Sequence, residues 1–582
     1  MKKVIKLIKT KKVIHYIIII IVGLLVSIPL KWLQLRATDD GWLHLLRSIG
    51  IDNAVNYAKF PFLVQPFFCN DWGYSMTAFY PTIVSYLPYF LGLIAGTFAN
   101  GLKVFASITI ILSGIFMYKF LIEVTNRKNV ALLAALIYMV LPYRFEDIYN
   151  RFAIGEFTAF VFIPLVFLGL YNLLNGDGKK HYYIVIGAAG LMLSHTISTV
   201  YTALFCVLYI LLNFKKFIDK DVIKKCIIDV FFILLITAIF WVPMLEFESN
   251  ANYSIFEPDV LKTSGKYVAD NTIEIWQLLK DKGEENGVSF VIGIPFITML
   301  LIGIFVYKNL DEKLKDFYMT GILFGIISIF MCTKFFPWFL MPDLLCTVQY
   351  PWRLLGFALV FLTPLCAINT CYLISRIKKE YIRNLTYIIV IMVVAGFTVK
   401  ELTVYKTDDL NLDSEYEQNI ISNPRIHYFS INRDYMPYDA IKEQRGYLLA
   451  RTNATYLLKG SAEVENEYKD GLHLELDLKT VTQGTELELP YLYYPGYTVK
   501  LIESNNTLIL PTSESENGFV KIVIPNNINE AKIIVDYTGT TIEKVAYIMS
   551  GISVLVFIGY IIYFRKIEKT IEIEETTDER KN

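Results

Sequence analysis

Long apolar stretches separated by short polar loops dominate the first 400 residues of the chain and return once near its end. Several of these stretches approach the ~20 residues that an α-helix needs to cross a bilayer. The thirteen stretches lie near residues 13–31, 81–98, 102–121, 128–142, 157–174, 182–196, 198–213, 225–245, 288–307, 316–333, 354–373, 384–400 and 543–564. The pattern therefore predicts an α-helical polytopic membrane protein with about 12–13 transmembrane segments.

Residues 401–542 follow a different pattern, in which apolar and polar positions alternate as they do in β-strands. The alternating runs are "LHLELDL", "TELELPYLYY", "YTVKLI", "FVKIVI" and "AKIIVDY", and the turn signals between them are "KDG", "PG", "ENG" and "PNN". They predict an extracytoplasmic β-sandwich-like or jelly-roll-like domain before the last helix. Its two histidines, His427 and His473, have no evident partner, which favours binding or positioning over chemistry.

The predicted order of domains follows from these two patterns. We expect a multi-pass membrane domain over 1–400, a β-rich domain over 401–542, a final transmembrane helix over 543–564 and a cytoplasmic tail over 565–582. The first apolar stretch is not expected to be a cleaved signal peptide, because the bulky, charged "LKWLQLRATDD" follows it instead of a small-residue cleavage site.

Composition agrees with an integral membrane protein and excludes other classes. Hydrophobic residues make up 54% of the chain, and the mean hydropathy is +0.44. The formal net charge is zero and no basic tail stands out, so nothing indicates a nucleic-acid partner. The seven cysteines are scattered without a C-x-x-C pair, which predicts neither a disulfide framework nor a zinc site.

Basic loops give the expected orientation in the membrane. The clusters "FRKIEK", "RIKKEYIR", "YKNLDEKLK", "FKKFIDKDVIKK", "GDGKK" and "NRKN" fall on alternate loops, which indicates that these loops are cytoplasmic. The outward segments are then 142–156, a short turn near 195, 246–287, 334–353 and 401–542. The six N-terminal lysines place the N-terminus with the C-terminus in the cytoplasm.

This orientation requires an even number of crossings before "NRKN", although three apolar stretches precede it. Residues 81–98 contain two prolines and two glycines, and we expect them not to span but to lie re-entrant or interfacial. The stretch "ATDDGWLHLLRSIG" is then outside. If another early segment fails to span instead, Asp39 and Asp40 face the cytoplasm.

Polar residues in that stretch form the first candidate site. On a helix, Asp40 and His44 share one face and Arg47 continues the same stripe. Such a cluster can accept a proton, bind a divalent ion or bind a phosphate. The alternative is structural, with Thr38 and Asp39 capping a helix and Arg47 meeting lipid head groups.

The second outward segment, "LPYRFEDIYNRFAIGEF", is dense in charge. It carries Arg144, Glu146, Asp147, Arg151 and Glu156 between apolar stretches. Helical spacings relate Arg144 to Asp147 and Asp147 to Arg151, so ion pairing within the loop is the structural alternative. Glu156 belongs to neither of these spaced pairs, and it begins the next apolar stretch.

His195 and Arg353 complete the outward candidates. His195 lies within a 32-residue apolar stretch that must form two helices of about 16 residues each. Each would span only about 24 Å, so the turn bearing His195 is expected to lie below the membrane surface in a cavity. Arg353 of "QYPWRLLG" opens a helix from outside. Packing of the histidine and interfacial anchoring by the arginine are the alternatives.

Several of these motifs resemble, in the same order, those of the YfhO-like bacterial membrane proteins, a group also labelled 6-pyruvoyl-tetrahydropterin synthase-related. They are "TDDGWLHLLRSI", "WGYSMTAFYPTIVSYLPYF", "LPYRFEDIYNRFAIGE", "LSHTIST", "QYPWRLLG" and "LPYLYYPGYTVKL". The resemblance covers most of the chain. It implies a branch of the GT-C glycosyltransferases, which are multi-pass enzymes that use polyprenyl-phosphate sugars and carry a catalytic acidic residue in the first outer loop.

The resemblance assigns roles to individual residues. Asp40 matches the first-loop acid, and His44 matches the histidine after it. Arg151 and Glu156 match the arginine and glutamate of the second outer loop, and Arg353 matches the arginine of the PWR motif. The implied location is the plasma membrane of a bacterial cell, with the active site facing outward.

One departure from the family's pattern concerns the base, because Asp39 and Asp40 are adjacent here and either is a candidate. Glu146 or Asp147 matches a second acidic position of other GT-C enzymes more loosely. A divalent ion such as Mg²⁺ or Mn²⁺ is an optional cofactor, with Asp40 and His44 as its candidate ligands. The candidates for substrate binding are His44, Arg47, Glu146, Asp147, Arg151, Glu156, His195 and Arg353.

General chemistry favours the same donor. Nucleotide sugars stay in the cytoplasm, and the chain has neither a Walker loop nor a dinucleotide-binding glycine motif, so an outward site must take its sugar from lipid. The hypothesis is that Asp40 or Asp39 activates a hydroxyl of an envelope polymer or glycolipid, while Arg353 or Arg151 neutralises the departing phosphate. The alternatives are a transporter or flippase for a lipid-linked or anionic solute and a non-catalytic scaffold.

Overall fold

The computed structural model describes residues 11–60, 62–257, 262–279, 288–401, 412–422, 433–442, 448, 450–504 and 506–578. Within these ranges, eight helices, two of them counted with flanking turns, are long and apolar enough to cross a membrane. They are α2 (Lys11–Ser27), α5 (Phe98–Thr125), α8 (Ile154–Asn175), α12 (Lys220–Asn250), α17 (Glu312–Cys332), α19 (Leu355–Ser375), α20 (Glu380–Glu401) and α24 (Thr541–Asp578).

Shorter apolar helices account for the other predicted stretches. They are α4 (Thr82–Ala95), α6 (Lys128–Met139), α9 (Tyr183–Met192), α10 (Thr196–Leu212) and the pair α15 (Ile294–Leu301) and α16 (Gly303–Val306). Every apolar stretch of the sequence is therefore helical, which confirms the predicted polytopic class. The loops between them contain α3 (Gly41–Tyr57), α7 (Pro142–Phe145), the π-helix η3 (Glu146–Asn150), η8 (Pro351–Leu354), α21 (Leu412–Ser422), η10 (Arg433–Tyr435) and α22 (Tyr438–Ile441).

Helix α4 is the segment expected not to span. Its 14 residues correspond to about 21 Å, which is less than the ~30 Å hydrocarbon core. The Ile83 amide at its start donates to the carbonyl of Leu193, 2.8 Å away in the turn between α9 and α10. Its last turns pack on the start of α5, where a Cβ on Gly101 would lie 2.4 Å from the Gly92 nitrogen. The length suits a non-spanning segment, and its place in the bilayer stays a prediction.

The described part of the β-domain contains nine strands in two antiparallel sheets. The sheet orders are β1-β4-β8-β7 and β2-β3-β9-β5-β6. The strands are β1 (Tyr456–Lys459), β2 (Glu463–Asp470), β3 (His473–Val481), β4 (Glu486–Leu492), β5 (Tyr497–Glu503), β6 (Asn506–Leu510), β7 (Thr512–Glu514), β8 (Phe519–Val523) and β9 (Ile528–Tyr537). The five predicted runs are confirmed as β3, β4, β5, β8 and β9, and the sandwich-like class is confirmed with them. The domain limits stay a prediction.

The histidines of this domain were expected to lack partners, and for His473 that expectation is wrong. Its Nδ1 lies 2.9 Å from Oδ1 of Asp536 and its Nε2 lies 3.2 Å from Oε1 of Glu475. His427 lies outside the described residues. The ring of His473 thus links neighbouring strands on the sheet surface, which is a structural role.

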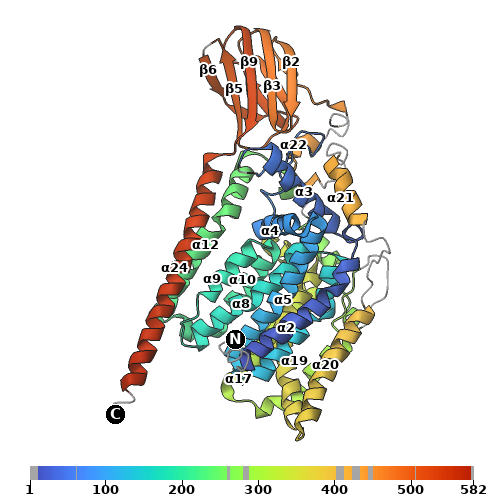
Figure 1. Ribbon diagram of the computed structural model, residues 1–582, viewed down its shortest axis with the longest axis vertical. Helices are drawn as coiled ribbons and strands as arrows, with labels where there is room; N and C mark the ends of the chain where they lie inside the picture. Colours follow the sequence, from blue (N-terminus) through green and yellow to red (C-terminus); the bar gives the residue numbers. More distant parts are fainter. Residues whose placement is uncertain are drawn as a thin grey trace.

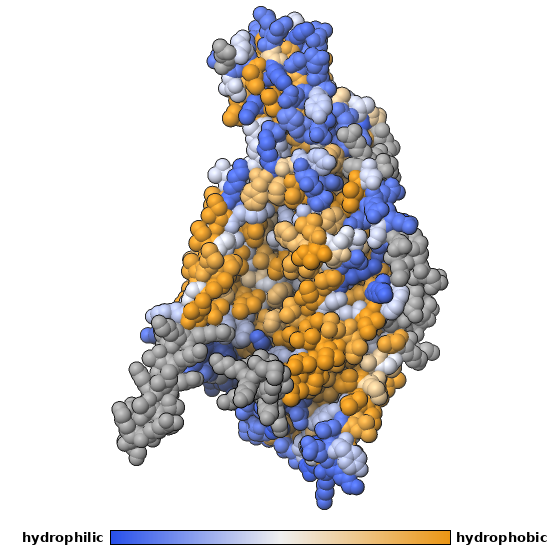
Figure 2. Space-filling view, viewed as in Figure 1, coloured by the Kyte–Doolittle hydropathy of each residue, from blue (hydrophilic) through white to orange (hydrophobic). Residues whose placement is uncertain are grey.

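Polarity divides the molecule along its long axis. Apolar side chains form a broad band over the helices, while the β-domain and the opposite end of the bundle are mainly polar (Figure 2). Helices α12 and α24 run side by side from the β-domain to that opposite end, where the start of α2 also lies (Figure 1). The apolar band matches the surface that a bilayer would cover.

The β-domain is fixed to the bundle through aromatic contacts. Tyr253, which follows α12, stacks on Tyr494 with ring centroids 5.6 Å apart and planes 4° apart. Trp72 packs against Phe519 edge to face at 5.3 Å, and the Leu492 amide donates to the Trp72 carbonyl over 2.9 Å. Buried residues of the bundle and of the sandwich form one continuous hydrophobic core, so the two parts pack as one body.

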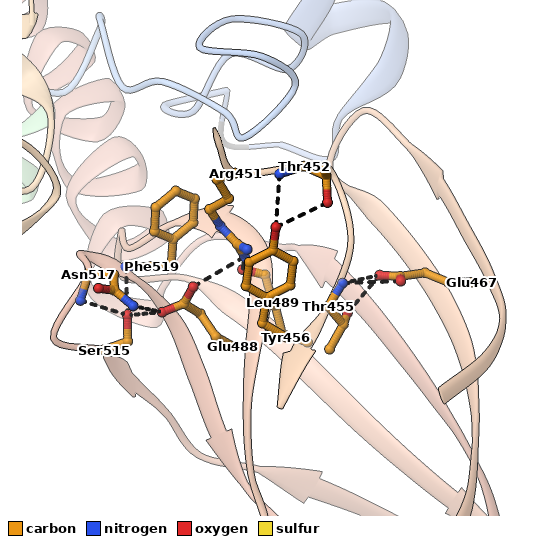
Figure 3. Close-up of polar contacts among 10 residues, drawn as sticks. All are labelled: Arg451, Thr452, Thr455, Tyr456, Glu467, Glu488, Leu489, Ser515, Asn517 and Phe519. Atoms are coloured by element: carbon orange, nitrogen blue, oxygen red, sulfur yellow. Dashed lines mark hydrogen bonds and ion pairs between the residues drawn. The ribbon is translucent and has the colours of Figure 1, made fainter. Parts of the chain in front are cut away.

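A buried arginine organises the start of the sandwich (Figure 3). Arg451 donates to the carbonyl of Leu489 over 3.1 Å and lies 3.4 Å from the carboxylate of Glu488. Its guanidinium lies 4.2 Å from the ring of Tyr456 and 4.3 Å from that of Phe519. Because both charges are fully buried and face each other, this cluster is a structural element of the β-domain.

Candidate active site

The first candidate stretch begins helix α3 without using the side chains of its two acidic residues as caps. Thr38 caps α3: its Oγ1 accepts from the Gly41 amide over 3.0 Å and donates to the Leu35 carbonyl over 2.7 Å. A Cβ on Gly41 would lie 2.3 Å from the Thr38 hydroxyl, so this tight start requires glycine. The capping expected of Thr38 is confirmed, whereas the carboxylate expected of Asp39 makes no capping bond, and neither does that of Asp40.

Backbone hydrogen bonds join this stretch to the second candidate loop. The Asp40 amide donates to the Arg151 carbonyl over 2.9 Å, and the Asp39 amide donates to the Asn150 carbonyl over 3.3 Å. The two motifs, about 110 residues apart in the chain, therefore lie at the same end of the bundle. Any topology that separates them across the membrane is excluded.

Arg151 is the centre of the second loop. Its Nη1 donates to Oδ1 of Asp147 over 2.5 Å and to Oε2 of Glu156 over 2.9 Å, and its guanidinium stacks 4.5 Å from the Trp352 ring. The Tyr143 hydroxyl donates to the other oxygen of Glu156 over 2.5 Å. After α7 the loop continues as the π-helix η3, a rare element that often occurs at functional sites. The expected Asp147–Arg151 pair is confirmed.

Arg353 approaches the same carboxylate from η8. Its Nε lies 3.7 Å from Oε2 of Glu156, and its Nη1 donates to the Val348 carbonyl over 3.1 Å and to Gln349 Oε1 over 3.0 Å. The Arg353 side chain is 17% exposed, against 6% for Arg151. Glu156 is thus shared by two arginines, of which Arg353 is the more accessible.

Asp40 lies within electrostatic reach of three arginines, Arg47, Arg151 and Arg353. The Asp40 side chain makes no hydrogen bond or ion pair within the described part of the chain. Burial raises the pKa of Asp40, and the three guanidinium groups oppose that rise. Asp39 is more exposed; burial raises its pKa as well, and Arg151 opposes the rise.

His44 and Arg47 form a buried pair behind Asp40. Arg47 Nη1 lies 2.6 Å from His44 Nδ1, and the guanidinium lies 3.7 Å from the ring centroid of Tyr80. Burial, and then the Arg47 charge, hold the pKa of His44 well below its usual value, so its ring is neutral at pH 7. Arg47 also interacts with Tyr435 of η10, which brings the segment before the β-domain up to this pair.

The residues that the sequence suggested for a divalent metal, Asp40 and His44, provide one carboxylate and one imidazole. Among described residues, no group of three or more His, Cys, Asp or Glu side chains could hold a metal ion. Nδ1 of His44 accepts from Arg47, and three arginines act electrostatically on Asp40. Mg²⁺ and Mn²⁺ prefer several oxygen ligands, so a divalent metal at Asp40 and His44 stays a hypothesis.

His195 lies at the side of this cluster, in the turn before α10. Its Nδ1 accepts from the Ser198 amide over 3.3 Å and lies 2.7 Å from the Ser198 hydroxyl, so the neutral ring carries its proton on Nε2. The ring interacts electrostatically with Glu156 and Arg353. A Cβ on Gly155 would lie 2.8 Å from Cδ2 of His195, so glycine permits this approach.

Glu146 lies next to the first stretch. Its Oε2 accepts from the Asn150 amide group over 2.7 Å, and the Asp39 charge acts on it. Burial raises the pKa of Glu146 to about 7. Burial also raises the pKa of Asp147 well above its usual value, with the Glu156 charge as the next cause.

Arg144 points away from the site, and the ion pair that its spacing to Asp147 suggested is not formed among described residues. Its Nη2 donates to the Thr109 carbonyl of α5 over 3.3 Å, and its guanidinium packs 5.6 Å from the Tyr138 ring and 5.1 Å from the Phe160 ring. Burial lowers the pKa of Arg144 to about 10. It holds the second loop against the bundle.

The site also contains residues that the sequence did not single out. Tyr143 binds Glu156, Trp352 stacks on Arg151, and Tyr80 stacks on Arg47. The sequence signal for Tyr143 and Trp352 was that each stands next to a charged motif residue in the chain. Because aromatic residues make up 15% of this chain, that signal was too common to distinguish them.

Comparison with known proteins gives the following relatives. No protein-family model matches the chain. An uncharacterized protein of Lactococcus lactis subsp. cremoris (strain MG1363) is 24% identical over 550 residues, which cover 88% of this chain and 89% of that protein. The match therefore extends over nearly the whole length of both chains.

One solved structure similar to this chain is the crystal structure of the Archaeoglobus fulgidus oligosaccharyltransferase complex with Zn and sulfate. The TM-score is 0.35 and the sequence identity is 16%, over 69% of this chain and 56% of that chain. The chain spans little more than half the length of that protein. A likeness of this degree carries no argument about function, and the resemblance to the YfhO-like group stays a resemblance.

Proposed function

We propose that this protein is a membrane glycosyltransferase that moves a sugar from a polyprenyl-phosphate donor to a cell-envelope polymer or glycolipid. The reaction would take place at the end of the bundle that carries the β-domain. The observation that carries the proposal is the Asp40 carboxylate, which is half-buried, makes no bond within the described residues and interacts electrostatically with three arginines. The resemblance of the ordered motifs supports the same reaction class.

The reaction needs one base and one cationic group. Asp40 accepts the proton of an acceptor hydroxyl, whose oxygen attacks the anomeric carbon and forms the new glycosidic bond with inversion. The bond between that carbon and the phosphate oxygen breaks, and the phosphate leaves with the electron pair. Arg353, the more accessible arginine beside Glu156, stabilises the charge that develops on the phosphate.

Asp40 is a better base candidate than Asp39 on the basis of its surroundings. Its carboxylate is more buried, and it interacts with three arginines where Asp39 interacts with one. The main-chain carbonyl of Asp39 accepts from Trp42 Nε1 over 3.0 Å, which gives that residue a role at the start of α3. A base close to the cationic groups can deprotonate the acceptor hydroxyl while those groups stabilise the departing phosphate in the same site.

Glu156 is a positioning residue in this scheme. Its two oxygens accept from Tyr143 and Arg151, so this carboxylate is held by protein donors, whereas that of Asp40 accepts no hydrogen bond from a described residue. It fixes Arg151 and lies 3.7 Å from Arg353, which sets the separation between the cationic side chains. Arg47 of the buried His44–Arg47 pair also interacts electrostatically with Asp40.

The test is sugar transfer from radiolabelled polyprenyl-phosphate hexoses into envelope polymers and glycolipids. Membranes would carry equal amounts of the wild-type chain, Asp40→Asn, Asp39→Asn or Arg353→Gln. Asp270→Asn is the matched control, because it removes an exposed carboxylate elsewhere in the chain. Loss of transfer in Asp40→Asn with retention in Asp270→Asn is the expected result. Absence of wild-type transfer with every donor would reject the proposal, and movement of labelled lipid across the membrane would then test a transporter.

A further inference from the structure

A groove separate from the candidate active site runs between α2, α6 and α20. Its volume is about 590 Å³, within the range of small-molecule sites. It begins near the end of the bundle opposite to the β-domain, where α2 and α20 flank it (Figure 1). Its wall is aliphatic and includes Ile18, Val22, Leu133, Leu136, Ile388 and Ile391.

One end of the groove is polar and positively charged. Its lining there includes His15, Asn129 and Asn384. Lys128, the neighbour of Asn129, acts electrostatically on His15, and Arg383, the neighbour of Asn384, acts on the lining residue Tyr387. Neither basic side chain forms an ion pair with a described residue, so the described part of the chain leaves this positive charge without an ionic partner.

We infer that the groove is a binding site for an anionic phospholipid, with one acyl chain along the aliphatic wall and the phosphate at the Lys128–Arg383 end. An apolar groove with basic side chains at one end matches a lipid with a negative head group. The donor lipid is a poorer match, because its phosphate belongs beside Arg353 at the other end of the bundle. The inference is independent of the proposed glycosyl transfer.

A bound lipid would also complete the packing of α20. Only 11% of its span is buried inside the protein, although Thr398 at its far end donates to the Val140 carbonyl over 2.6 Å. Val140 immediately precedes the loop that carries the candidate site. The lipid therefore occupies space between α20 and the bundle and steadies a helix that the protein contacts sparsely.

The experiment is native mass spectrometry of the delipidated full chain, titrated with phosphatidylglycerol or with phosphatidylcholine of the same acyl chains. We expect one phosphatidylglycerol to bind more tightly than phosphatidylcholine. The double variant Lys128→Gln with Arg383→Gln should lose that preference, about fivefold in affinity for each charge removed. Ile388→Trp, which fills the groove, should weaken the binding of both lipids.

Matched controls separate the site from general effects. Lys220→Gln with Lys224→Gln removes two exposed charges from α12 at the same end and should leave the preference intact. Val393→Trp places the same indole side chain on α20 on the side of a different groove and should not affect binding. Equal affinity for the two lipids, or equal effects of Ile388→Trp and Val393→Trp, would overturn the inference. Displacement of phosphatidylglycerol by polyprenyl phosphate at equal concentration would also overturn it.

Discussion

The balance between burial and the arginines decides how Asp40 titrates. Burial raises its pKa and Arg47, Arg151 and Arg353 lower it. A base acts only when deprotonated, so kcat/KM should rise with pH through an acidic limb that lies above the usual aspartate range. The side chains around Asp40 therefore predict the pH dependence as well as the reaction class.

Arg47→Gln should move this acidic limb to higher pH. Removing the guanidinium removes one of the charges that lower the Asp40 pKa, so the carboxylate stays protonated to a higher pH. The measurement is the pH profile of kcat/KM for residual sugar transfer, each variant normalised to its own maximum. Arg36→Gln removes an exposed arginine stacked on Tyr416 and should leave the limb in place. A limb that stays fixed in Arg47→Gln would assign it to another group.

Arg151→Ala should strongly destabilise the fold, because it leaves the buried carboxyl groups of Asp147 and Glu156 without their shared partner. Removing one member of a buried ion pair costs about 3–5 kcal/mol. Thermal unfolding in detergent measures the effect. Lys334→Ala, which breaks a surface pair with Glu274, should cost less than about 1 kcal/mol. Similar melting temperatures for the two variants would show that the Arg151 cluster is not structural.

At the residue scale, the sequence predicted the charged part of the site better than its aromatic part. Carboxylates and arginines are dense in the short segments between apolar stretches, so Asp40, Arg151 and Arg353 stood out, and the structure places both arginines within electrostatic reach of Asp40. The direction in which each charged side chain points could not be predicted from the sequence. The spacing of Arg144 and Asp147 suits an ion pair, but Arg144 turns toward the Thr109 carbonyl instead, because the helix interior offers it rings and an acceptor.

At the scale of elements, the pattern of hydrophobic and polar positions located the helices and the central strands. It did not locate β2 and β6, which are edge strands. β2 has charged residues on both faces, and β6 exposes Leu508 and Ile509 by 47% and 66%, so neither shows inward alternation. Edge strands tolerate such sequences because only one side is paired. The π-helix η3 likewise leaves no periodic signal in five residues.

The contact between α4 and α5 depends on a pair of glycines, and Gly101→Ala should disrupt it. A Cβ there would lie 2.5 Å from both the Gly92 Cα and the Pro88 carbonyl oxygen, which are backbone atoms that cannot rotate away. Overpacking of this kind costs about 1–3 kcal/mol, measured as a lower unfolding temperature in detergent. Gly559→Ala in α24 meets no atom within 4 Å and should be neutral or stabilising by up to about 1 kcal/mol. A stable Gly101→Ala protein would mean that α4 is free to move away.

At the scale of the whole molecule, the β-domain contributes to the site through the segment before it. The Tyr494 hydroxyl donates to the Tyr435 carbonyl over 2.8 Å, and Tyr435 interacts with Arg47. The sequence distinguished a helical pattern from a β-strand pattern but gave no sign of this link, because contacts between distant segments leave no local pattern. We therefore expect the β-domain to position the site.

Tyr494→Phe should reduce sugar transfer, because it leaves the Tyr435 carbonyl without this donor. An unsatisfied buried carbonyl costs about 1–3 kcal/mol, enough to shift the segment that contacts Arg47. The assay would compare kcat and KM with those of Tyr468→Phe, which removes a hydroxyl from a 60% exposed side chain of the same domain. Unchanged kinetics in both variants would show that the β-domain does not position the site.

The orientation in the membrane is the prediction on which the lipid donor depends. Ser513 on β7 of the β-domain and Ser375 at the end of α19 are exposed. The β-domain lies at one end of the molecule, and α19 lies toward the other end (Figure 1). Each would be changed to cysteine in a chain whose two partly exposed cysteines, Cys206 and Cys226, are replaced by alanine. Basic loops predict that a membrane-impermeant maleimide labels Ser513→Cys in intact cells, and labels Ser375→Cys only after lysis. The reverse result would place Asp40 in the cytoplasm, where nucleotide sugars are available, and would remove the reason to expect a polyprenyl-phosphate donor.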